Sequence, residues 1–416
     1  MRDVCNFGFL GRKNHIALEW KECILIFGGW GEKERPCVPS HVQVLCNGKW
    51  RCVKTTGRNF IAEEDVQDIP MAELLLLNPR TARVVGDKVY VMATKDGTDG
   101  SLIEKVCVLD LARWSWTDLT PKGNAPIMAT SSTSWLHDDK IYVFGGRWKG
   151  DIGIAHALSY RTGHHENVYS GGKIATNQLF CYDTTTNTFE WPLNDILGPP
   201  RYGHSSFLHG NAVFIFGGLG ADNMVNNELL VMDLETKKMK PIQADMTDNS
   251  IPWKRTFHSM TKTSTGKAIL YGGFGSREGS LKLGLALGDC WILHVERILS
   301  GKVTQPADLW SRVVTSGELE PRFAHSAIIE PQSERLYVFG GGLWGKDMHW
   351  MPSNKTRVVS FTTAPLELLA MERAVARYDA EDQDLEEFLP KGHAIRKALE
   401  AKRQTCALEH MVTISW

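Results

Sequence analysis

Histidines are the first residues of this sequence that could do chemistry, because an imidazole can ligate a metal ion or transfer a proton. His156, His164 and His165 lie in the longest insertion, roughly residues 150–176. Their spacing is irregular and no cysteine or carboxylate partner stands out beside them, so a polar insertion is the favoured interpretation. No GxSxG nucleophile turn and no GxxxxGK[ST] phosphate loop stands out either. The sequence therefore predicts no catalytic residue, no metal site and no cofactor, and hence no enzyme.

A second kind of chemistry is the binding of a peptide by cations and aromatic rings. Arg147, Trp148 and Lys149 form a cation–aromatic–cation triplet directly before the insertion. Further candidates elsewhere in the chain are Tyr202, Thr256, Phe257, Phe323 and Trp344. An aromatic pocket with one or two cations would suit a peptide, particularly one that ends in a carboxylate. The alternative for Arg147 and Lys149 is a loop whose charges face water.

These candidates must be positioned by a phrase that repeats along the chain. Apolar runs end in Gly-Gly at Gly29, Gly146, Gly218, Gly273 and Gly341, and a sixth run that ends at Thr94 lacks the glycines. Arg-x-x-His precedes four of these runs, at Arg12, Arg201, Arg255 and Arg322, with degenerate copies at Arg80/Arg83 and Ile127/Thr130. Short β-branched and aromatic runs between Gly, Asp and Asn turns are typical of antiparallel strands. Because the histidines recur with the repeat, we interpret them as structural.

This arrangement resembles the kelch family, whose signature is Arg-x-x-His, an apolar run with Gly-Gly, then Asp and Trp, as in Val106–Trp116. Kelch repeats of about 50 residues form blades of four strands. The resemblance covers roughly Arg12 to Phe361 and implies an all-β fold, a six-bladed kelch β-propeller with a short C-terminal helical segment. The expected domains are 1–363 (the propeller, second blade degenerate), 364–404 (the helices) and 405–416 (a tail). Either the residues before Arg12 or the run Met411–Trp416 would close the ring.

The same resemblance implies where a ligand would bind. In kelch proteins the loops after Gly-Gly converge with the Arg-x-x-His residues on one mouth of the ring, which would bring the peptide-binding candidates together. Kelch receptors that read diglycine chain ends carry two arginines in the loop after the fourth Gly-Gly. Here that loop, Leu219–Glu228, contains no arginine. Diglycine specificity is therefore not carried over to this chain.

The composition narrows the function classes. The chain has 416 residues, 43% of them hydrophobic, and a formal net charge of −1, so no overall field favours nucleic acid or an anionic membrane. No apolar window suits a membrane span, and the first residues lack the apolar core of a secretion signal. Nine cysteines occur without a CxxC pair, and Cys23, Cys107 and Cys181 lie in strand-like runs. These features predict reduced thiols and a cytoplasmic or nuclear location.

The segment after the last repeat has the composition of helices. Good helix formers replace β-branched residues from Pro365 onward. Leu366, Leu369, Ala370 and Ala374 fall on one side of the expected helix at i, i+3, i+4 and i+8. One interpretation is that the helices of this segment pack against the propeller and complete the fold.

The other interpretation comes from resemblance. The segment resembles the box with which kelch substrate receptors of cullin ubiquitin ligases dock onto elongin C. Pro365, Leu366, Ala370 and Ala374 match that box in order, and Leu389–Pro390 resembles the element that contacts the cullin. The match departs from the family in Ala370, where a Cys is usual, and in the small Ala374. Both differences reduce the apolar contact, at about 0.8 kcal/mol for each lost methylene.

Three functions remain open. The first is a substrate-recognition subunit of a cullin–elongin ubiquitin ligase, which binds a peptide degron at the propeller mouth and elongin B/C and a cullin through the helices. The second is a kelch interaction scaffold unrelated to ubiquitin. The third is an enzyme on a kelch-like ring, for which the sequence offers no ligand cluster. All but the third imply a protein or peptide partner, and none implies nucleic acid or a membrane.

Overall fold

The computed structural model describes residues 11–31, 41–46, 48–57, 76–94, 105–127, 129–149, 167–170, 173–191, 198–243, 250–303, 305, 308–313, 319–330, 335–344 and 350–359. The chain divides into two compact units, Met1–Val313 with Leu319–Val359, and Val314–Glu318 with Ser360–Trp416. Everything below concerns the first unit. The expected helices at 364–404 and the tail at 405–416 lie outside the described residues, so those domain boundaries stay predictions.

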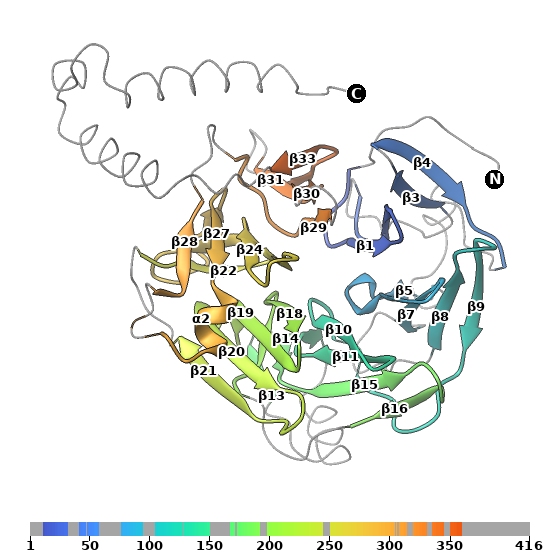
Figure 1. Cartoon of the computed structure of the whole chain (residues 1–416), viewed down its shortest axis with the longest axis horizontal. Coiled ribbons are helices and arrows are strands. Elements are labelled where there is room, and N and C mark those ends of the chain that lie inside the picture. Colours follow the sequence, from blue (N-terminus) through green and yellow to red (C-terminus); the bar gives the residue numbers. More distant parts are fainter. Residues whose placement is uncertain are drawn as a thin grey trace, which may run out of the picture. The chain divides into compact units, whose positions relative to one another are not determined.

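Six of the nine antiparallel sheets in the described part of the chain follow one another around the molecule (Figure 1). The first contains β1 (Ile16–Trp20), β2 (Cys23–Phe27), β3 (His41–Cys46) and β4 (Lys49–Lys54). The second contains β5 (Leu76–Leu77), β6 (Arg83–Val85), β7 (Lys88–Thr94), β8 (Lys105–Asp110) and β9 (Ser115–Leu119). The third contains β10 (Thr133–His137), β11 (Lys140–Phe144), β15 (Leu179–Asp183) and β16 (Thr188–Glu190).

The fourth sheet contains β17 (Arg201–Tyr202), β18 (Ser205–His209), β19 (Ala212–Gly220), β20 (Val225–Asp233) and β21 (Met239–Gln243). The fifth contains β23 (Ser259–Lys262), β24 (Ala268–Tyr271), β27 (Cys290–Leu293) and β28 (Trp310–Arg312), and the sixth contains β29 (Ser326–Glu330), β30 (Arg335–Phe339) and β33 (Thr356–Val359). Two short helices are described: η4 (Pro79–Thr81) lies between β5 and β6 of the second sheet, and α2 (Val295–Leu299) lies between β27 and β28 of the fifth. None of the described helices has the length and apolar character that a membrane crossing requires.

The sheets surround a central axis like the blades of a propeller (Figure 1). The innermost strands β10, β18, β23 and β29 contact one another in that order, and β29 contacts β1. Between the sixth and first sheets, the Asn14 N–H donates to the Ala324 carbonyl at 2.8 Å, and the Ser326 hydroxyl donates to the His15 carbonyl at 2.9 Å. The first and sixth sheets are therefore neighbours. Both segments proposed to supply the closing strand lie outside the described residues, and the number of blades in the whole ring stays a prediction.

Apolar side chains fill the spaces between neighbouring sheets. One cluster joins the first and second sheets through Phe27, Val91 and Trp116, and others join the second to the third, the third to the fourth and the fourth to the fifth. Phe339 of the sixth sheet packs edge-on against Trp50 of the first, with ring centroids 5.8 Å apart. Because each sheet is covered on both faces, its central strands are apolar at successive positions rather than at alternate ones.

The Gly-Gly pairs leave room for the Arg-x-x-His motifs. Gly217 and Gly218 have φ of +64° and +99°, which favour glycine. A Cβ on Gly217 would lie 2.8 Å from the Arg255 carbonyl oxygen of the next sheet, and one on Gly218 would lie 2.9 Å from the His204 Cβ of its own sheet. The same contacts recur at the Gly-Gly pairs of the third and fifth sheets. The first glycine thus leaves space for the motif of the next sheet, and the second leaves space for the residue at the histidine position of the same sheet.

The motif arginines hold these turns from within. Arg255 is fully buried, donates to the Gly272 carbonyl at 3.1 Å and forms two bonds to Asp289 at 2.7 and 2.8 Å. Equivalent bonds to the first glycine of the pair come from Arg12, Arg201 and Arg322 at 3.2, 3.2 and 3.0 Å. A guanidinium suits this role because its fixed fork of donors meets a carbonyl and a carboxylate together.

The motif histidines pack between neighbouring blades. His258 lies edge-on to Phe216 of the preceding sheet at 5.5 Å, and His325 lies edge-on to Tyr271 at 5.1 Å. Burial holds the pKa of His15, His204, His258 and His325 well below its ordinary value, with the positive charge of the nearby motif arginine adding to the effect. Their burial supports the structural interpretation of these residues.

The degenerate copy in the third sheet is displaced from the expected position. Ile127 and Thr130 were expected to replace Arg and His, and that alignment is wrong. Thr130 pairs with Arg147, as Phe323 pairs with Gly342 in the sixth sheet, so Ala129 and Ser132 stand in the places of Arg and His. Neither Ala nor Ser resembles the residue that it replaces, which is why the sequence pattern missed the shift.

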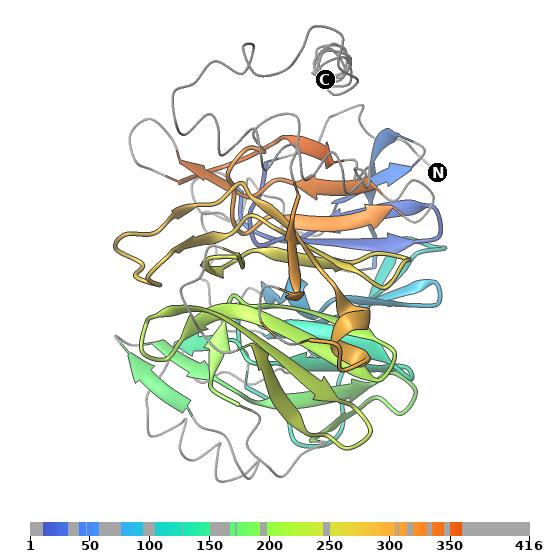
Figure 2. The ribbon, with the colours of Figure 1, turned by 60° about the vertical axis from the view of Figure 1, so that its left-hand side comes forward.

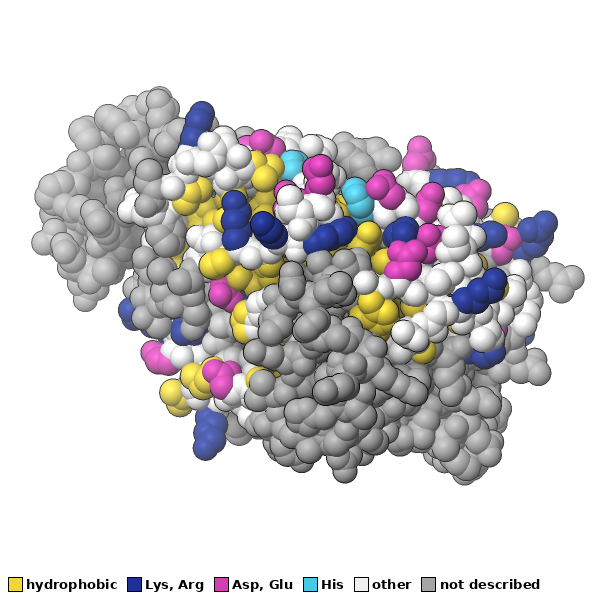
Figure 3. Space-filling view, turned by 90° about the horizontal axis from the view of Figure 1, so that it is seen from below, with side chains coloured by type: hydrophobic (Ala, Val, Ile, Leu, Met, Phe, Trp, Pro, Cys, Tyr) yellow, Lys and Arg dark blue, Asp and Glu magenta, His cyan; other side chains and the backbone are white. Residues whose placement is uncertain are grey.

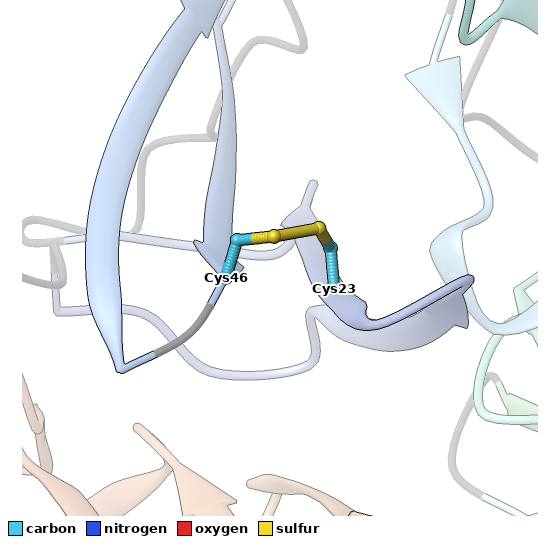
Figure 4. The surroundings of a disulfide bond; sticks show 2 residues. All are labelled: Cys23 and Cys46. Carbon is cyan, nitrogen blue, oxygen red and sulfur yellow. A yellow bond between two sulfur atoms is a disulfide. The ribbon is translucent and has the colours of Figure 1, made fainter.

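The prediction of reduced thiols throughout is wrong for one pair. Cys23 and Cys46 form a disulfide across β2 and β3 (Figure 4). They are directly opposite in the register, and their Cα atoms are 4.5 Å apart, the separation of a non-hydrogen-bonded antiparallel pair. Cys107 and Cys181 are buried and form no disulfide, and burial raises the pKa of the Cys181 thiol to about 12. Strand register, rather than cysteine spacing, brings the bonded pair together.

We predict that Arg255→Met destabilises the propeller by about 3–5 kcal/mol, because Asp289 would stay largely buried without its partner. The control is Arg113→Met, since Arg113 is 79% exposed where it meets Asp110, and its loss should cost about 1 kcal/mol or less. Denaturant unfolding of the three proteins measures the difference. Equal losses for the two variants would contradict a structural role for the motif arginine.

Because of these buried histidines, we predict that the free energy of unfolding decreases in acid. Their folded pKa values are lowered, so the stabilisation is complete above the unfolded pKa of about 6.5 and is lost as the pH falls toward the folded pKa. Each buried neutral histidine contributes a slope of about 1.4 kcal/mol per pH unit in that window. His258→Gln should remove about one such slope between pH 6 and 5, whereas His137→Gln, at the end of β10 and partly exposed, serves as control. An unchanged slope in His258→Gln would refute the assignment.

A candidate peptide-binding mouth

After the Gly-Gly pairs of the third, fifth and sixth sheets, the chain leaves toward one side of the ring. Three small sheets form there: β12 (Arg147–Lys149) with β14 (Lys173–Thr176) and β13 (Asn167–Ser170), β22 (Lys254–Thr256) with β25 (Phe274–Ser276) and β26 (Leu285–Ala286), and β31 (Gly342–Trp344) with β32 (Trp350–Pro352). Figure 2 shows all three projecting to the same side, on the left of the view. We call this side the mouth.

A chain of backbone hydrogen bonds forms the floor of the mouth. The third residue of the motif has a positive φ in five sheets: Asn14 (55°), Ser131 (58°), Gly203 (65°), Phe257 (56°) and Ala324 (54°). The N–H of each residue from Gly203 onward donates to the carbonyl of its counterpart in the preceding sheet, at 2.7 or 2.8 Å, and Asn14 completes the series by donating to Ala324. This series, which we call the peptide garland, fixes the adjacent motif residues relative to one another.

Arg147, Tyr202 and Phe257 come together on this floor. The Arg147 guanidinium lies over the Tyr202 ring, 5.1 Å from its centroid, and the Tyr202 and Phe257 rings meet edge-on at 6.5 Å. Burial raises the pKa of Tyr202, and the charge of Arg147 partly opposes that rise. Arg147 is half-buried and is paired with no carboxylate among the described residues. The arrangement offers a preorganised cation beside aromatic surface, which can bind an anionic group and an apolar one together.

Thr256 and Phe323 have more limited roles. The Thr256 hydroxyl is buried and donates to the Gly203 carbonyl at 3.3 Å, so it supports the floor rather than facing a ligand. Phe323 packs edge-on against Phe274 at 6.0 Å and lies over Gly342, where a Cβ would be 2.5 Å from its ring. Phe323 thus extends the aromatic surface to the sixth sheet.

The other candidates are placed only in part. The backbone of Trp148 and Lys149 lies in β12 and that of Trp344 in β31, both at the mouth, while their side chains are outside the described part. His156, His164 and His165, and the docking candidates Leu366, Leu369, Ala370, Ala374, Leu389 and Pro390, also lie outside it. Within the described ranges, no group of three or more His, Cys, Asp or Glu side chains is arranged to hold a metal ion.

An apolar rim next to the mouth was not predicted. Met224, Leu283 and Leu285 are 42%, 67% and 47% exposed. Met224 lies in the β19–β20 turn, Leu283 in the loop before β26 and Leu285 in β26 itself. The turn and the loop are joined by the bond from the Val225 N–H to the Gly279 carbonyl at 2.9 Å. The sequence signal was a methionine in a polar turn and the alternating leucines from Leu281 to Leu287. Apolar side chains also surface among charged ones in the space-filling view (Figure 3).

The rim is continuous with the mouth through a buried cluster. Tyr202, Leu219 and Val225 are buried together, and Phe257 and Leu281 pack against them. Met224 directly precedes Val225 in the chain, and Leu283 follows Leu281 by two residues, so the rim adjoins this cluster in sequence. Exposed apolar patches with a polar border commonly mark sites of protein contact.

Comparisons with known proteins agree with this geometry. A family model described as the Attractin/LZTR1 beta-propeller matches residues 166–364. Kelch domain-containing protein 2 of Bos taurus is 21% identical over 86% of this chain and 83% of its own length. Kelch domain-containing protein 1 of Mus musculus is 23% identical over 55% of this chain, which spans about half (52%) of that protein.

A solved structure extends the comparison to the fold. The structure of YjhT covers 84% of this chain and 98% of its own, with a TM-score of 0.54 and 14% identity. At that identity the likeness concerns the fold alone. The repeated glycine turns, the ring of sheets and these matches together show that the chain is a kelch-type β-propeller.

Proposed function

We propose that this chain is a non-catalytic binding module that captures a peptide segment of a partner protein at the propeller mouth. The observation that carries the proposal is the Arg147–Tyr202–Phe257 group, in which a half-buried guanidinium lies on an aromatic surface. Arginine and aromatic residues dominate the energetics of protein interfaces when they are held rigidly. The peptide garland provides that rigidity, because Phe257 bonds to the neighbouring sheet on either side.

The surroundings of Arg147 define the preferred ligand. A carboxylate, either a chain terminus or an acidic side chain, would form a charge-assisted bond with the guanidinium. Apolar side chains of the peptide next to that carboxylate would contact Tyr202, Phe257 and the rim formed by Met224, Leu283 and Leu285. The ligand class is therefore a short peptide with one anionic group and at least one large apolar residue.

The finer function rests on sequence resemblance. We infer that the partner peptide is a degron and that the chain is the substrate-recognition subunit of a cullin–elongin ubiquitin ligase. The support is the box at Pro365, Leu366, Ala370 and Ala374 and the Leu389–Pro390 pair, which directly follow the last kelch repeat. The alternative is a kelch scaffold whose C-terminal segment serves the fold only.

The peptide proposal predicts selection by the mouth. A display library of random 12-residue peptides with free carboxyl ends should yield peptides that bind the wild-type chain, and Arg147→Met should weaken their binding about tenfold or more. Arg113→Met removes an equally charged residue on an outer turn and should bind as the wild type does. If the selected peptides bind Arg147→Met and wild type equally, the mouth is not the site.

The ligase proposal predicts a stoichiometric complex with elongin B/C on co-purification. Leu366→Asp should abolish that complex in a folded protein, because a charge cannot enter an apolar docking groove. The control is Leu299→Asp, which adds the same charge at an exposed leucine of α2 and should keep the complex. A folded wild-type chain that does not bind elongin B/C would leave the scaffold function standing.

A further inference from the structure

The second sheet interrupts the peptide garland. Where the other five sheets place a residue of positive φ, the second sheet places the short helix η4, which begins at Pro79. Two hydrogen bonds hold η4 and its N-cap residue to the third sheet. The Ser134 hydroxyl donates to the Arg80 carbonyl at 2.6 Å, and the Asn78 side-chain amide donates to the Ala129 carbonyl at 3.0 Å. These bonds fix the starting point of the Arg80 side chain.

Arg80 differs from three other motif arginines in whether a carboxylate is paired with its guanidinium. Arg201, Arg255 and Arg322 are paired with Glu228, Asp289 and Glu320 respectively. In the part of the chain that the structure describes, no carboxylate pairs with Arg80, and its buried Nε has no hydrogen-bond partner. Burial lowers the pKa of Arg80 to about 10, so the guanidinium is still charged at neutral pH.

The Arg80 charge acts at the centre of the ring. It lowers the pKa of His15, His204, His258 and His325, which belong to the first, fourth, fifth and sixth sheets. Contact between η4 and β10, one of the innermost strands, places Arg80 near the axis that these histidines surround. These histidines are uncharged at neutral pH and do not offset the guanidinium. Arg80 is half-buried, so one side of it stays open to solvent.

A hydroxyl donor lies in the sheet to which η4 is tied. Ser132 takes the place of the motif histidine in the third sheet, is fully buried, and its Oγ has no hydrogen-bond partner. A half-buried cation without a carboxylate partner and a buried, unpaired hydroxyl donor both cost folding free energy. An anion bound at the guanidinium would remove the cost of the unpaired cation.

We propose that the centre of the ring binds one small anion at the Arg80 guanidinium. The ligand class is a monovalent anion of the size of chloride or a carboxylate, supplied either as a free ion or by the carboxylate of a bound peptide. This proposal does not depend on the proposed binding of a peptide, because the Arg80 guanidinium is present whether or not a peptide is bound. It is separate from Arg147, which lies over Tyr202 at the mouth.

The test is the thermal midpoint of the full chain with chloride or formate replacing the bulky anion isethionate at constant ionic strength. Raising either small anion to 100 mM should raise the midpoint of the wild type by about 2 °C. Arg80→Met should give no rise, and it should be at least as stable as the wild type in isethionate, because it removes an unpaired cation. Arg113→Met is the control and should respond as the wild type does. Equal responses of Arg80→Met and wild type would overturn the proposal.

Two further measurements complete the test. N-acetylglycine and its amide, as models of a peptide end, distinguish the two sources of the anion. If N-acetylglycine raises the thermal midpoint and its amide does not, the site accepts the carboxylate of a bound peptide. If chloride raises the midpoint and N-acetylglycine does not, the site binds a free ion. If Arg80→Met does not fold, wild-type crystals soaked in bromide serve instead. Anomalous density within hydrogen-bond distance of the Arg80 guanidinium supports the site, and its absence at saturating bromide refutes it.

Discussion

The fold depends on the bond from a buried motif arginine to the carbonyl of a Gly-Gly turn. Arg255 shows the arrangement most fully, since one guanidinium holds Gly272 and Asp289 together at the inner end of the sheet. The turn can form only with glycine, because a side chain there would strike the neighbouring motif. Arginine, glycine and histidine thus form one interlocked unit, and its repetition places the sheets around an axis.

The same unit creates the binding surface. The chain must leave the crowded turn after the second glycine, and it does so toward the mouth, where β12, β25 and β31 begin. The positive φ of residues such as Phe257 turns each motif so that its backbone reaches the next sheet. Arg147 and Tyr202 meet because the third and fourth sheets are locked together in this way. The mouth is therefore a consequence of how the blades are joined.

The repeated features of the fold could be predicted from the sequence, whereas features that depend on how one particular strand pairs with its neighbour could not. The glycine turns and four arginines were visible because they recur, and with them the strands. The shift to Ala129 and Ser132 was hidden because neither resembles Arg or His. Cys23 and Cys46 are 23 residues apart, and only the pairing of β2 with β3 makes them neighbours. Candidate mouth residues could be chosen by type, but Thr256 proved to be buried support, and the Met224 rim had no repeating pattern to mark it.

The junction between the first and sixth sheets has a kinetic consequence. The Ser326 hydroxyl and the His15 carbonyl that meet there are 311 residues apart in sequence. Bringing together the ends of so long a flexible loop costs about 5 kcal/mol of chain entropy. Other neighbouring sheets follow one another directly along the chain, so their contacts need much shorter closures. We therefore expect ring closure to be a late step of folding, with the free edges of the open ring exposed until it is complete.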